Sequence, residues 1–549
     1  MSQTDPRAYP SPRAAMEDMR LRDLTEGIYL HVEPGVYMEQ VMLSYPGPLM
    51  IVPTHGPGTV ELVMVGEQDL LVARGHRELY GITLRVESEL RAPVKTEGAG
   101  GLKAVDCRFI GTEPLRVWGS GKSEFVNCRF EGTGLEWRGG RGLIAGCVFD
   151  RARLSLTEDA VVVARSIRFS GFEGGGVGAS PLSISGSRAE ITECVITDCH
   201  VAYSRGGPGG EAVVVSQGSQ VSFVDLSVSG DRCNAIHVQG KNTRAVFDRL
   251  RVEGGFEGRY TVFVRWSAKV RLADTWISHV HGGGVKVVDA ELDVDGLTVE
   301  NTKGEALDVV EGDLRGRGVR LSRAEMDLIK VVASRVRLSD VEFRDHTGVE
   351  QVGEDGKTYP RYGAVYVEDG DVELEDVRAF DLDGWLLNVT DGRARMSSVT
   401  AERLATVALV KKGAMVHLKD VKSLEGRRNQ LLVLSAGFLE TSDCVFEGSS
   451  HALACADAAG ITLRSTVLRR AKSAGLLLTG GASALLEDSE VRDCSRDGIH
   501  LEDEKSRVSL VRCTIADNGG HGVIGPSGAE VKSEDGVFSG NRGHGTDGF

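Results

Sequence analysis

A line of polar and aromatic side chains recurs at coil-like intervals through the middle of the sequence. Each member stands between two apolar residues, so in a strand it should point outward while its neighbours point inward. Such a surface could form hydrogen bonds with sugars and stack on them. We name this line the polar stripe; it comprises His237, Lys286, Asp308, Lys330, Tyr366 and Asn388.

The chemistry expected of a sugar-degrading stripe depends on its carboxylates and bases. A glycoside hydrolase needs two carboxylates near the scissile bond, and a lyase needs a base near a sugar carboxylate whose charge is neutralised. Asp308 lies between Lys286 and Lys330 along the stripe. The alternative for these three residues is an ion-pair ladder that only joins neighbouring strands.

Four apolar residues continue the same line after the polar stripe. A contiguous apolar surface often marks an interface, which predicts contact with a protein partner or a second copy of the chain. The alternative is that a neighbouring loop covers the surface. We name this line the apolar stripe; it comprises Leu409, Val433, Ala454 and Leu477.

These side chains need a scaffold that repeats, and the sequence contains one. The segment 485–524 states the same pattern twice, as a short alternating strand, a polar break, a second strand and another break. The position of Cys513 recurs, mostly every 19 to 25 residues, at Ser489, Thr466, Cys444, Val421, Val399, Val377, Val341, Val319, Leu297, Thr275, Leu250, Leu226, Cys194, Ile167, Cys147, Cys128 and Cys107. Units this short cannot bury their own apolar face, so they must stack. The sequence therefore predicts an all-β, right-handed parallel β-helix of about 20 coils.

Composition narrows the classes of partner and site. The net charge of −15 argues against nucleic acid and anionic membranes as partners. Six of the ten cysteines occupy the repeat position that elsewhere holds valine, leucine or isoleucine, so we expect buried free thiols without a metal or other cofactor. No signal peptide and no 18-residue apolar stretch is seen, which together with free thiols favours the cytoplasm.

The N-terminal region differs from the repeats. Residues 1–10 are polar and predict a disordered tail, and Ser11 followed by Pro12 predicts the start of a helix that ends near Arg20. A strand, Pro34-Gly35 and a further strand follow. This order resembles the opening of pectate-lyase-like β-helix proteins, a resemblance that implies a helical cap and first coils in 11–80 and the β-helix in 81–549. That superfamily includes lyases, hydrolases, esterases and non-enzymatic binders.

Three insertions interrupt the repeat, at 171–181, 200–211 and 347–361. In a solenoid, insertions leave the coil as loops on one side and often wall a binding groove. The alternative is that they are solvated loops without a ligand.

A second candidate for catalysis lies near the C-terminus. Asp497-Gly498, Asp517 and Gly520-His521-Gly522 resemble pieces of polygalacturonase-type glycoside hydrolases, which implies two acid–base aspartates supported by the histidine. The chain departs from that pattern because it lacks an adjacent aspartate pair and an Arg-Ile-Lys segment after the histidine. Ordinary β-helix turns are the alternative.

The main hypothesis from the sequence is a non-catalytic scaffold of the bacterial β-helix repeat type, which binds a protein partner through the apolar stripe. The alternative is a carbohydrate-binding or polysaccharide-degrading protein, either a lyase or a glycoside hydrolase. The chain offers no pair of neighbouring carboxylates that would decide between the two by pattern alone.

Overall fold

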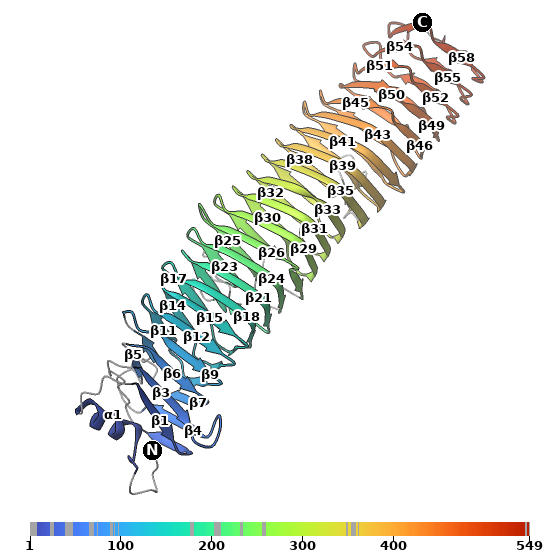
Figure 1. Cartoon of the computed structure of the whole chain (residues 1–549). Helices are drawn as coiled ribbons and strands as arrows, with labels where there is room; N and C mark the ends of the chain where they lie inside the picture. Colours follow the sequence, from blue (N-terminus) through green and yellow to red (C-terminus); the bar gives the residue numbers. More distant parts are fainter. Residues whose placement is uncertain are drawn as a thin grey trace. The chain divides into compact units, whose positions relative to one another are not determined.

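The computed structural model of the chain describes residues 8–21, 27–38, 48–64, 71–73, 75–87, 92, 94–96, 98–175, 180–202, 210–230, 234–254, 260–346, 350–352, 358–360, 362–543 and 546–547. The chain divides into two compact units, residues 1–276 and 277–549. Each unit consists of coils whose strands form three faces, and each strand pairs in parallel with its equivalent in the next coil (Figure 1).

Unit 1 begins with the one helix found among the described residues, α1 (Pro12–Leu21). Ser11 caps it, because the Ala14 backbone N–H donates to the Ser11 hydroxyl at 3.2 Å. The first face of unit 1 contains β1 (Ile28–Val32), β3 (Leu49–Pro53), β6 (Arg77–Tyr80), β9 (Leu102–Val105), β12 (Lys122–Val126), β15 (Arg141–Ala145) and β26 (Arg244–Asp248). The second face contains β2 (Gly35–Met38), β4 (Val60–Met64), β7 (Ile82–Val86), β10 (Arg108–Ile110), β13 (Arg129–Glu131), β16 (Val148–Asp150) and β27 (Arg251–Glu253).

Longer strands run through both of these faces, namely β18 (Val161–Ser170), β21 (Arg188–Thr197), β24 (Gln220–Ser229) and β29 (Lys269–Val280), the last four residues of which belong to unit 2. The third face of unit 1 contains β5 (Leu71–Ala73), β8 (Val94–Thr96), β11 (Leu115–Trp118), β14 (Leu135–Arg138), β17 (Leu154–Thr157), β20 (Leu182–Ser185), β23 (Glu211–Ser216), β25 (Asn234–Gln239) and β28 (Tyr260–Arg265). A parallel pair, β19 (Glu173–Gly175) and β22 (His200–Ala202), extends from two of these coils.

Unit 2 repeats the arrangement. Strands that run through its first and second faces are β31 (Glu291–Thr302), β33 (Asp313–Ala324), β35 (Arg335–His346), β39 (Asp371–Leu382), β41 (Arg393–Glu402) and β43 (Met415–Gly426). Later coils split this strand in two, as β45 (Phe438–Ser442) with β46 (Val445–Ser449), β48 (Gly460–Arg464) with β49 (Val467–Ala471), β51 (Ser483–Glu487) with β52 (Glu490–Arg492), β54 (Arg507–Val511) with β55 (Thr514–Ala516), and β57 (Glu530–Glu534) with β58 (Val537–Ser539).

The third face of unit 2 carries most of the residues of interest. It contains β30 (Gly283–Val288), β32 (Leu307–Val310), β34 (Ile329–Val332), β38 (Val365–Glu368), β40 (Trp385–Thr390), β42 (Thr406–Lys411), β44 (Leu431–Leu434), β47 (Ala454–Asp457), β50 (Leu476–Thr479), β53 (Ile499–Leu501), β56 (Val523–Ile524) and β59 (Thr546–Asp547). A small hairpin, β36 (Glu350–Val352) with β37 (Thr358–Pro360), interrupts it between β34 and β38.

One corner residue in each coil allows the chain to turn from the first face to the second. This residue directly precedes every repeat position from Cys107 to Cys513, and its φ lies between 45° and 81°. Aspartate, asparagine, serine and glycine dominate at the corner, for example Asp106, Asn127 and Asp340. These residues tolerate the left-handed region better than bulky ones. The turn then sends the next side chain, the repeat position, into the core.

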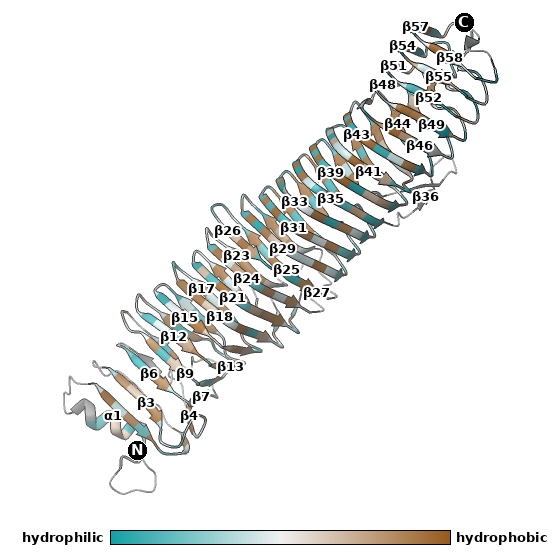
Figure 2. Cartoon of the chain, turned by 45° about the vertical axis from the view of Figure 1, so that its right-hand side comes forward, coloured by the Kyte–Doolittle hydropathy of each residue, from teal (hydrophilic) through white to brown (hydrophobic). Residues whose placement is uncertain are grey.

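The core consists of ladders of identical or similar side chains. In unit 1 the rings of Phe109, Phe130, Phe149 and Phe169 stack in order, with centroids 5.1, 4.6 and 4.7 Å apart. Nine cysteines of the described chain are buried and free, as expected for small apolar ladder residues. In Figure 2 both apolar and hydrophilic segments lie along the strands, as expected where inward and outward side chains alternate.

The fold expected from the sequence is confirmed: the protein is an all-β, right-handed parallel β-helix of about 20 coils. The tail over 1–10 falls mostly outside the described residues, and the boundaries 11–80 and 81–549 stay a prediction. Parts of all three insertions, 171–181, 200–211 and 347–361, also lie outside the described residues. No described helix has the length and apolar character that crossing a membrane requires.

Candidate functional site

Five members of the polar stripe lie in unit 2 on consecutive coils of the third face. Backbone pairing sets Lys286 beside Asp308, Asp308 beside Lys330, Lys330 beside Tyr366, and Tyr366 beside Asn388. Neighbouring strands are about 4.8 Å apart, so each of these side chains can reach the next.

The closest contact in the stripe joins Lys286 and Asp308. The ammonium Nζ lies 2.6 Å from Oδ2 of the carboxylate, and the two side chains are 16% and 1% exposed. A buried ion pair depends on both partners, because either charge alone would be desolvated without compensation. The pair therefore holds β30 and β32 together and keeps a carboxylate on this face.

Two buried carboxylic acids beside the stripe were not among the residues selected from the sequence. Glu305 and Asp327 each precede a third-face strand by two residues, and both are 6% exposed. Oε1 of Glu305 lies 3.7 Å from Nζ of Lys330. The signal was present in the sequence, since an acid stands at the same offset in two successive coils.

Asp327 is the acid of this group whose pKa is raised. Burial raises the pKa of its carboxyl to about 7, and the charge of Glu305 acts in the same direction. The Gly363 backbone N–H, which donates to Oδ1 at 2.8 Å, and the Lys330 ammonium act against this rise. Near neutral pH, Asp327 can therefore donate a proton.

The next coils add polar atoms that are buried without a partner. Oδ1 of Asn388 and Nε1 of Trp385 have no hydrogen-bond partner in the described part of the chain. The Trp385 ring packs directly against Gly363, since a Cβ added at Gly363 would lie 2.3 Å from that ring. Gly363 is the residue whose backbone N–H binds Asp327. The Tyr366 hydroxyl donates to Oε2 of Glu368 at 3.2 Å, and burial together with the charge of Glu368 raises the pKa of Tyr366.

We name this group of residues the acid–lysine cluster; it comprises Lys286, Glu305, Asp308, Asp327, Lys330, Tyr366, Trp385 and Asn388. Chemically it combines an acid whose pKa is raised to about 7, carboxylates paired with ammonium groups, and hydrogen-bonding atoms without a partner in the described part of the chain. Such a set can bind hydroxyl groups and transfer a proton to a leaving oxygen.

The remaining member of the polar stripe, His237, belongs to unit 1. It keeps the outward register but is 1% exposed rather than accessible, and Nδ1 of its ring lies 3.2 Å from Oε1 of Glu211. The expectation of an exposed histidine is wrong, because its ring stacks on Phe263 with centroids 5.1 Å apart.

The apolar stripe is not the surface that the sequence predicted. Val433 and Ala454 are fully buried, and the residues in register with Leu409 and Leu477 are Leu432 and Cys455. The placement of Val433 and Ala454 is therefore wrong by one residue. Leu409 is itself only 5% exposed, so an apolar contact surface through all four residues does not exist.

The C-terminal candidates Asp497, Asp517 and His521 have structural contacts. Oδ1 of Asp497 accepts from the His521 backbone N–H at 2.8 Å, and Oδ2 lies 3.2 Å from Nδ1 of His500. Asp517 occupies a turn with φ 55°. These contacts are typical of β-helix turns, and no interaction links the side chains of the two aspartates.

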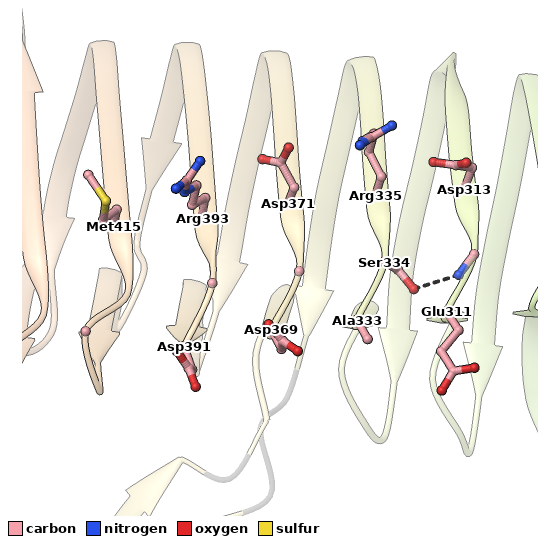
Figure 3. A pocket seen from close by; sticks show the side chains of 14 residues that line it. Glu311, Asp313, Ala333, Ser334, Arg335, Asp369, Asp371, Asp391, Arg393 and Met415 are labelled. Atoms are coloured by element: carbon pink, nitrogen blue, oxygen red, sulfur yellow. Dashed lines mark hydrogen bonds between the residues drawn. The ribbon is translucent and has the colours of Figure 1, made fainter.

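An open pocket of about 670 Å³ follows the corner between the third and first faces of unit 2. One row of side chains pairs in register along it, as Asp313, Arg335, Asp371, Arg393 and Met415. Figure 3 shows that Glu311, Asp369 and Asp391 extend on the other side of the corner. All these charged side chains are exposed, which is typical of a solvated corner.

The described residues contain no group of three or more histidine, cysteine, aspartate or glutamate side chains placed to hold a metal ion. The acid–lysine cluster is also a poor metal site on chemical grounds, since two ammonium groups lie among its carboxylates.

Comparison with known proteins supports the fold. A family model described as a right handed beta helix region matches residues 407–547. No curated protein matches the sequence. The chain therefore has the right-handed parallel β-helix fold, and no specific family member is indicated.

Solved structures with similarity to this chain include the PL6 family alginate lyase AlyGC, at 10% identity and a TM-score of 0.32, with 98% of this chain and 99% of that chain covered. The A-module of the Azotobacter vinelandii mannuronan C-5 epimerase AlgE4 aligns at 11% identity and a TM-score of 0.23, over 66% of this chain and 91% of that chain. The Vag8–C1 inhibitor complex aligns at 12% identity and a TM-score of 0.29, over 93% of this chain and 100% of that chain. Similarity this low carries no argument about function.

Proposed function

We propose that the chain binds a polysaccharide on the third face of unit 2 and degrades it as a glycoside hydrolase. The observation that carries the proposal is Asp327, a buried acid with a pKa of about 7 beside carboxylates that are paired with lysines. Two carboxyl groups in different protonation states are what glycosidic hydrolysis requires.

In this mechanism Asp327 donates its proton to the oxygen of the scissile bond as the bond breaks. Asp308, whose charge is compensated by Lys286, acts on the opposite side as base or nucleophile. Nε1 of Trp385 and Oδ1 of Asn388 are a donor and an acceptor without partners, suited to orienting sugar hydroxyl groups.

The protein-binding scaffold is not favoured by any feature of the described residues. That hypothesis rested on the apolar stripe, and three of the four residues in the stripe, Leu409, Val433 and Ala454, are buried in the core. A carbohydrate partner on the acid–lysine cluster therefore replaces a protein partner on the apolar stripe.

The experiment that tests the proposal incubates the protein with a panel of neutral and acidic polysaccharides and measures new reducing ends. The wild type should release them from at least one polysaccharide, and Asp327→Asn should lower kcat by about 100-fold or more while retaining binding. Asp313→Asn, an exposed aspartate of the same unit, is the matched control and should leave the rate unchanged.

The same assay contains the results that contradict the proposal. Ultraviolet absorbance from unsaturated uronide products would assign a lyase reaction instead. If the wild type releases nothing from any polysaccharide, or Asp327→Asn works at the wild-type rate, hydrolysis at this cluster is wrong.

A further inference from the structure

A pocket of about 430 Å³ lies on the first face of unit 2, whereas the acid–lysine cluster lies on the third face. The pocket crosses β45, β48, β51, β54 and β57, where one outward row pairs in register as Phe438, Gly460, Ser483, Arg507 and Glu530. The side chains of this row are large at both ends and small in the middle. Gly460 and Ser483 therefore leave a hollow at the surface, of a volume typical of small-molecule sites.

Phe438 forms an apolar wall of the hollow. It is 38% exposed, whereas the phenylalanines of the core ladders are buried. The ring extends over Gly460, because a Cβ at Gly460 would lie 3.0 Å from Cδ2 of the ring. Gly460 does not have a positive φ, so the backbone does not require glycine at this position. The glycine instead provides room for the ring and for a ligand beside it.

Hydroxyl groups line the middle of the hollow. Ser483 is exposed, and Ser509, on the neighbouring outward row, is half-buried beside Leu485. Both serines line the pocket, and each hydroxyl can donate one hydrogen bond and accept others. The hollow therefore combines an aromatic ring with polar groups that solvent can reach, as binding pockets for small molecules do.

The end of the hollow opposite Phe438 is positively charged. Nε of Arg507 lies 3.4 Å from Oε2 of Glu530, and Nζ of Lys532 lies 2.6 Å from Oε1 of the same carboxylate. The hydrogen bond from Lys532 holds the pKa of Glu530 below its ordinary value, so the carboxylate is ionised. Two cations share one anion, and the other residues that line the pocket are uncharged. The pocket thus has a surplus positive charge, in a chain whose net charge is −15.

A saccharide fits the two ends of the hollow. The faces of a sugar ring carry C–H groups that pack on an aromatic ring, and its edge carries hydroxyl groups that bind to side chains such as Ser483. A neutral saccharide would leave the surplus positive charge uncompensated. A carboxylate or sulfate group, in contrast, accepts charge-assisted hydrogen bonds from guanidinium and ammonium groups.

We propose that this pocket is a second binding site of unit 2, for a saccharide that bears a carboxylate or sulfate group. The sugar ring packs on Phe438, and the anionic group binds Arg507 and Lys532. The site does not depend on hydrolysis at the acid–lysine cluster, because the two sites share no residue.

The test follows Phe438 by ¹⁹F NMR in the full-length protein labelled with fluorinated phenylalanine, with its resonance assigned by its loss in Phe438→Leu. The probes are pentagalacturonate, which carries carboxylates, a κ-carrageenan tetrasaccharide, which carries sulfates, and cellopentaose, which is neutral. At least one anionic probe should shift the resonance, and the probe that does so identifies the anionic group. The shift should persist in Asp327→Asn, so the failure of hydrolysis and the failure of this site are distinguishable.

Titration of the same resonance gives the affinity. Arg507→Gln should weaken it by about tenfold or more. Arg317→Gln should leave it unchanged and is the matched control, since the Arg317–Asp295 pair is 71% and 40% exposed and the Arg507–Glu530 pair is 70% and 41% exposed. Gly460→Val should abolish the shift, because its side chain fills the hollow. The proposal is overturned if no anionic probe shifts the resonance, if cellopentaose binds equally well, or if Arg507→Gln binds as tightly as the wild type. Should Gly460→Val fail to fold, the other titrations still decide.

Discussion

Two stretches of the third face in unit 2 follow one register line and differ in what their side chains do. Between Lys286 and Asn388, side chains of neighbouring coils contact each other through two ion pairs, Lys286 with Asp308 and Lys330 with Glu305. From Leu409 to Leu477 the line continues through Leu432 and Cys455, side chains that contribute apolar packing. Both stretches have the same backbone arrangement. The fold therefore sets where the outward side chains lie, and only the type of the outward residue sets which interactions they form.

The largest effect should come from a charge placed at the inward position of the apolar stretch. Val433→Asp buries an unpaired carboxylate and should destabilise its coil by about 4 kcal/mol or more, while Leu432→Asp, on the half-buried outward side, should cost about 1 kcal/mol. Because a repeat array does not unfold in two states, hydrogen exchange at β42, β44 and β47 is the measurement. If both variants lose the same protection, the assignment of Val433 to the inward side and Leu432 to the outward side is wrong.

In the polar stretch, Lys286→Met should destabilise β30 and β32 by about 3 to 5 kcal/mol, because Asp308 loses its ammonium partner at a buried position. The double variant Lys286→Met with Asp308→Leu should recover most of that loss. Arg337→Ala is the control, since Arg337 and Glu373 form a pair in which both side chains are more than half exposed, and it should cost at most about 1 kcal/mol. Hydrogen exchange at the paired strands is again the measurement, and similar losses of protection at the buried and exposed pairs would contradict this.

The third prediction concerns pH: stability should depend on pH in the polar stretch, through Asp327, and not in the apolar stretch. The folded pKa of Asp327 lies above its ordinary value of 3.8, at about 7, so the folded state binds the proton more tightly. Its contribution is complete below about pH 4 and is lost as the pH rises to about 7, by up to about 4 kcal/mol. Asp327→Asn should remove this slope in hydrogen exchange at β34 and β38, whereas β44 should show none in either protein. A wild-type slope that persists in the variant would assign it to another group.

The smallest expected effect is that of Tyr366→Phe. It removes one hydrogen bond, from the hydroxyl to Glu368, at a partly exposed position, and should cost about 0.5 to 1.5 kcal/mol. Thermal unfolding should change little, while affinity for a bound polysaccharide should fall. If affinity is unchanged, Tyr366 belongs to the scaffold and the acid–lysine cluster ends before β38.

The same comparison explains what could be predicted from the sequence. In Val285-Lys286-Val287 and Leu307-Asp308-Val309 a polar residue between two apolar ones reveals which side chains face outward. In Leu431–Leu434 every residue is apolar, so the alternation is invisible, and Val433 was placed on the wrong side.

Other parts of the site required coordinates for a different reason. Glu305 and Asp327 lie in connections, outside the alternating pattern of the strands, and the burial that raises the pKa of Asp327 comes from packing between coils. The C-terminal Asp497 and His521 fit a hydrolase motif by type, yet a backbone N–H of the motif itself occupies the carboxylate. The fold was predictable because its corners and ladders repeat, and a single recurring position reveals them.

The corner residue has a consequence for how such a chain can change its length. Each coil turns from its first face to its second at one corner residue of positive φ and pairs only with its neighbours, so one coil is a complete module with its own corner. An in-frame duplication or deletion of one whole repeat preserves every ladder on either side, whereas the gain or loss of a single codon within a strand reverses inward and outward for the rest of that strand. Genes of this kind can therefore lengthen or shorten by whole repeats, and the acid–lysine cluster can persist while the number of coils around it changes.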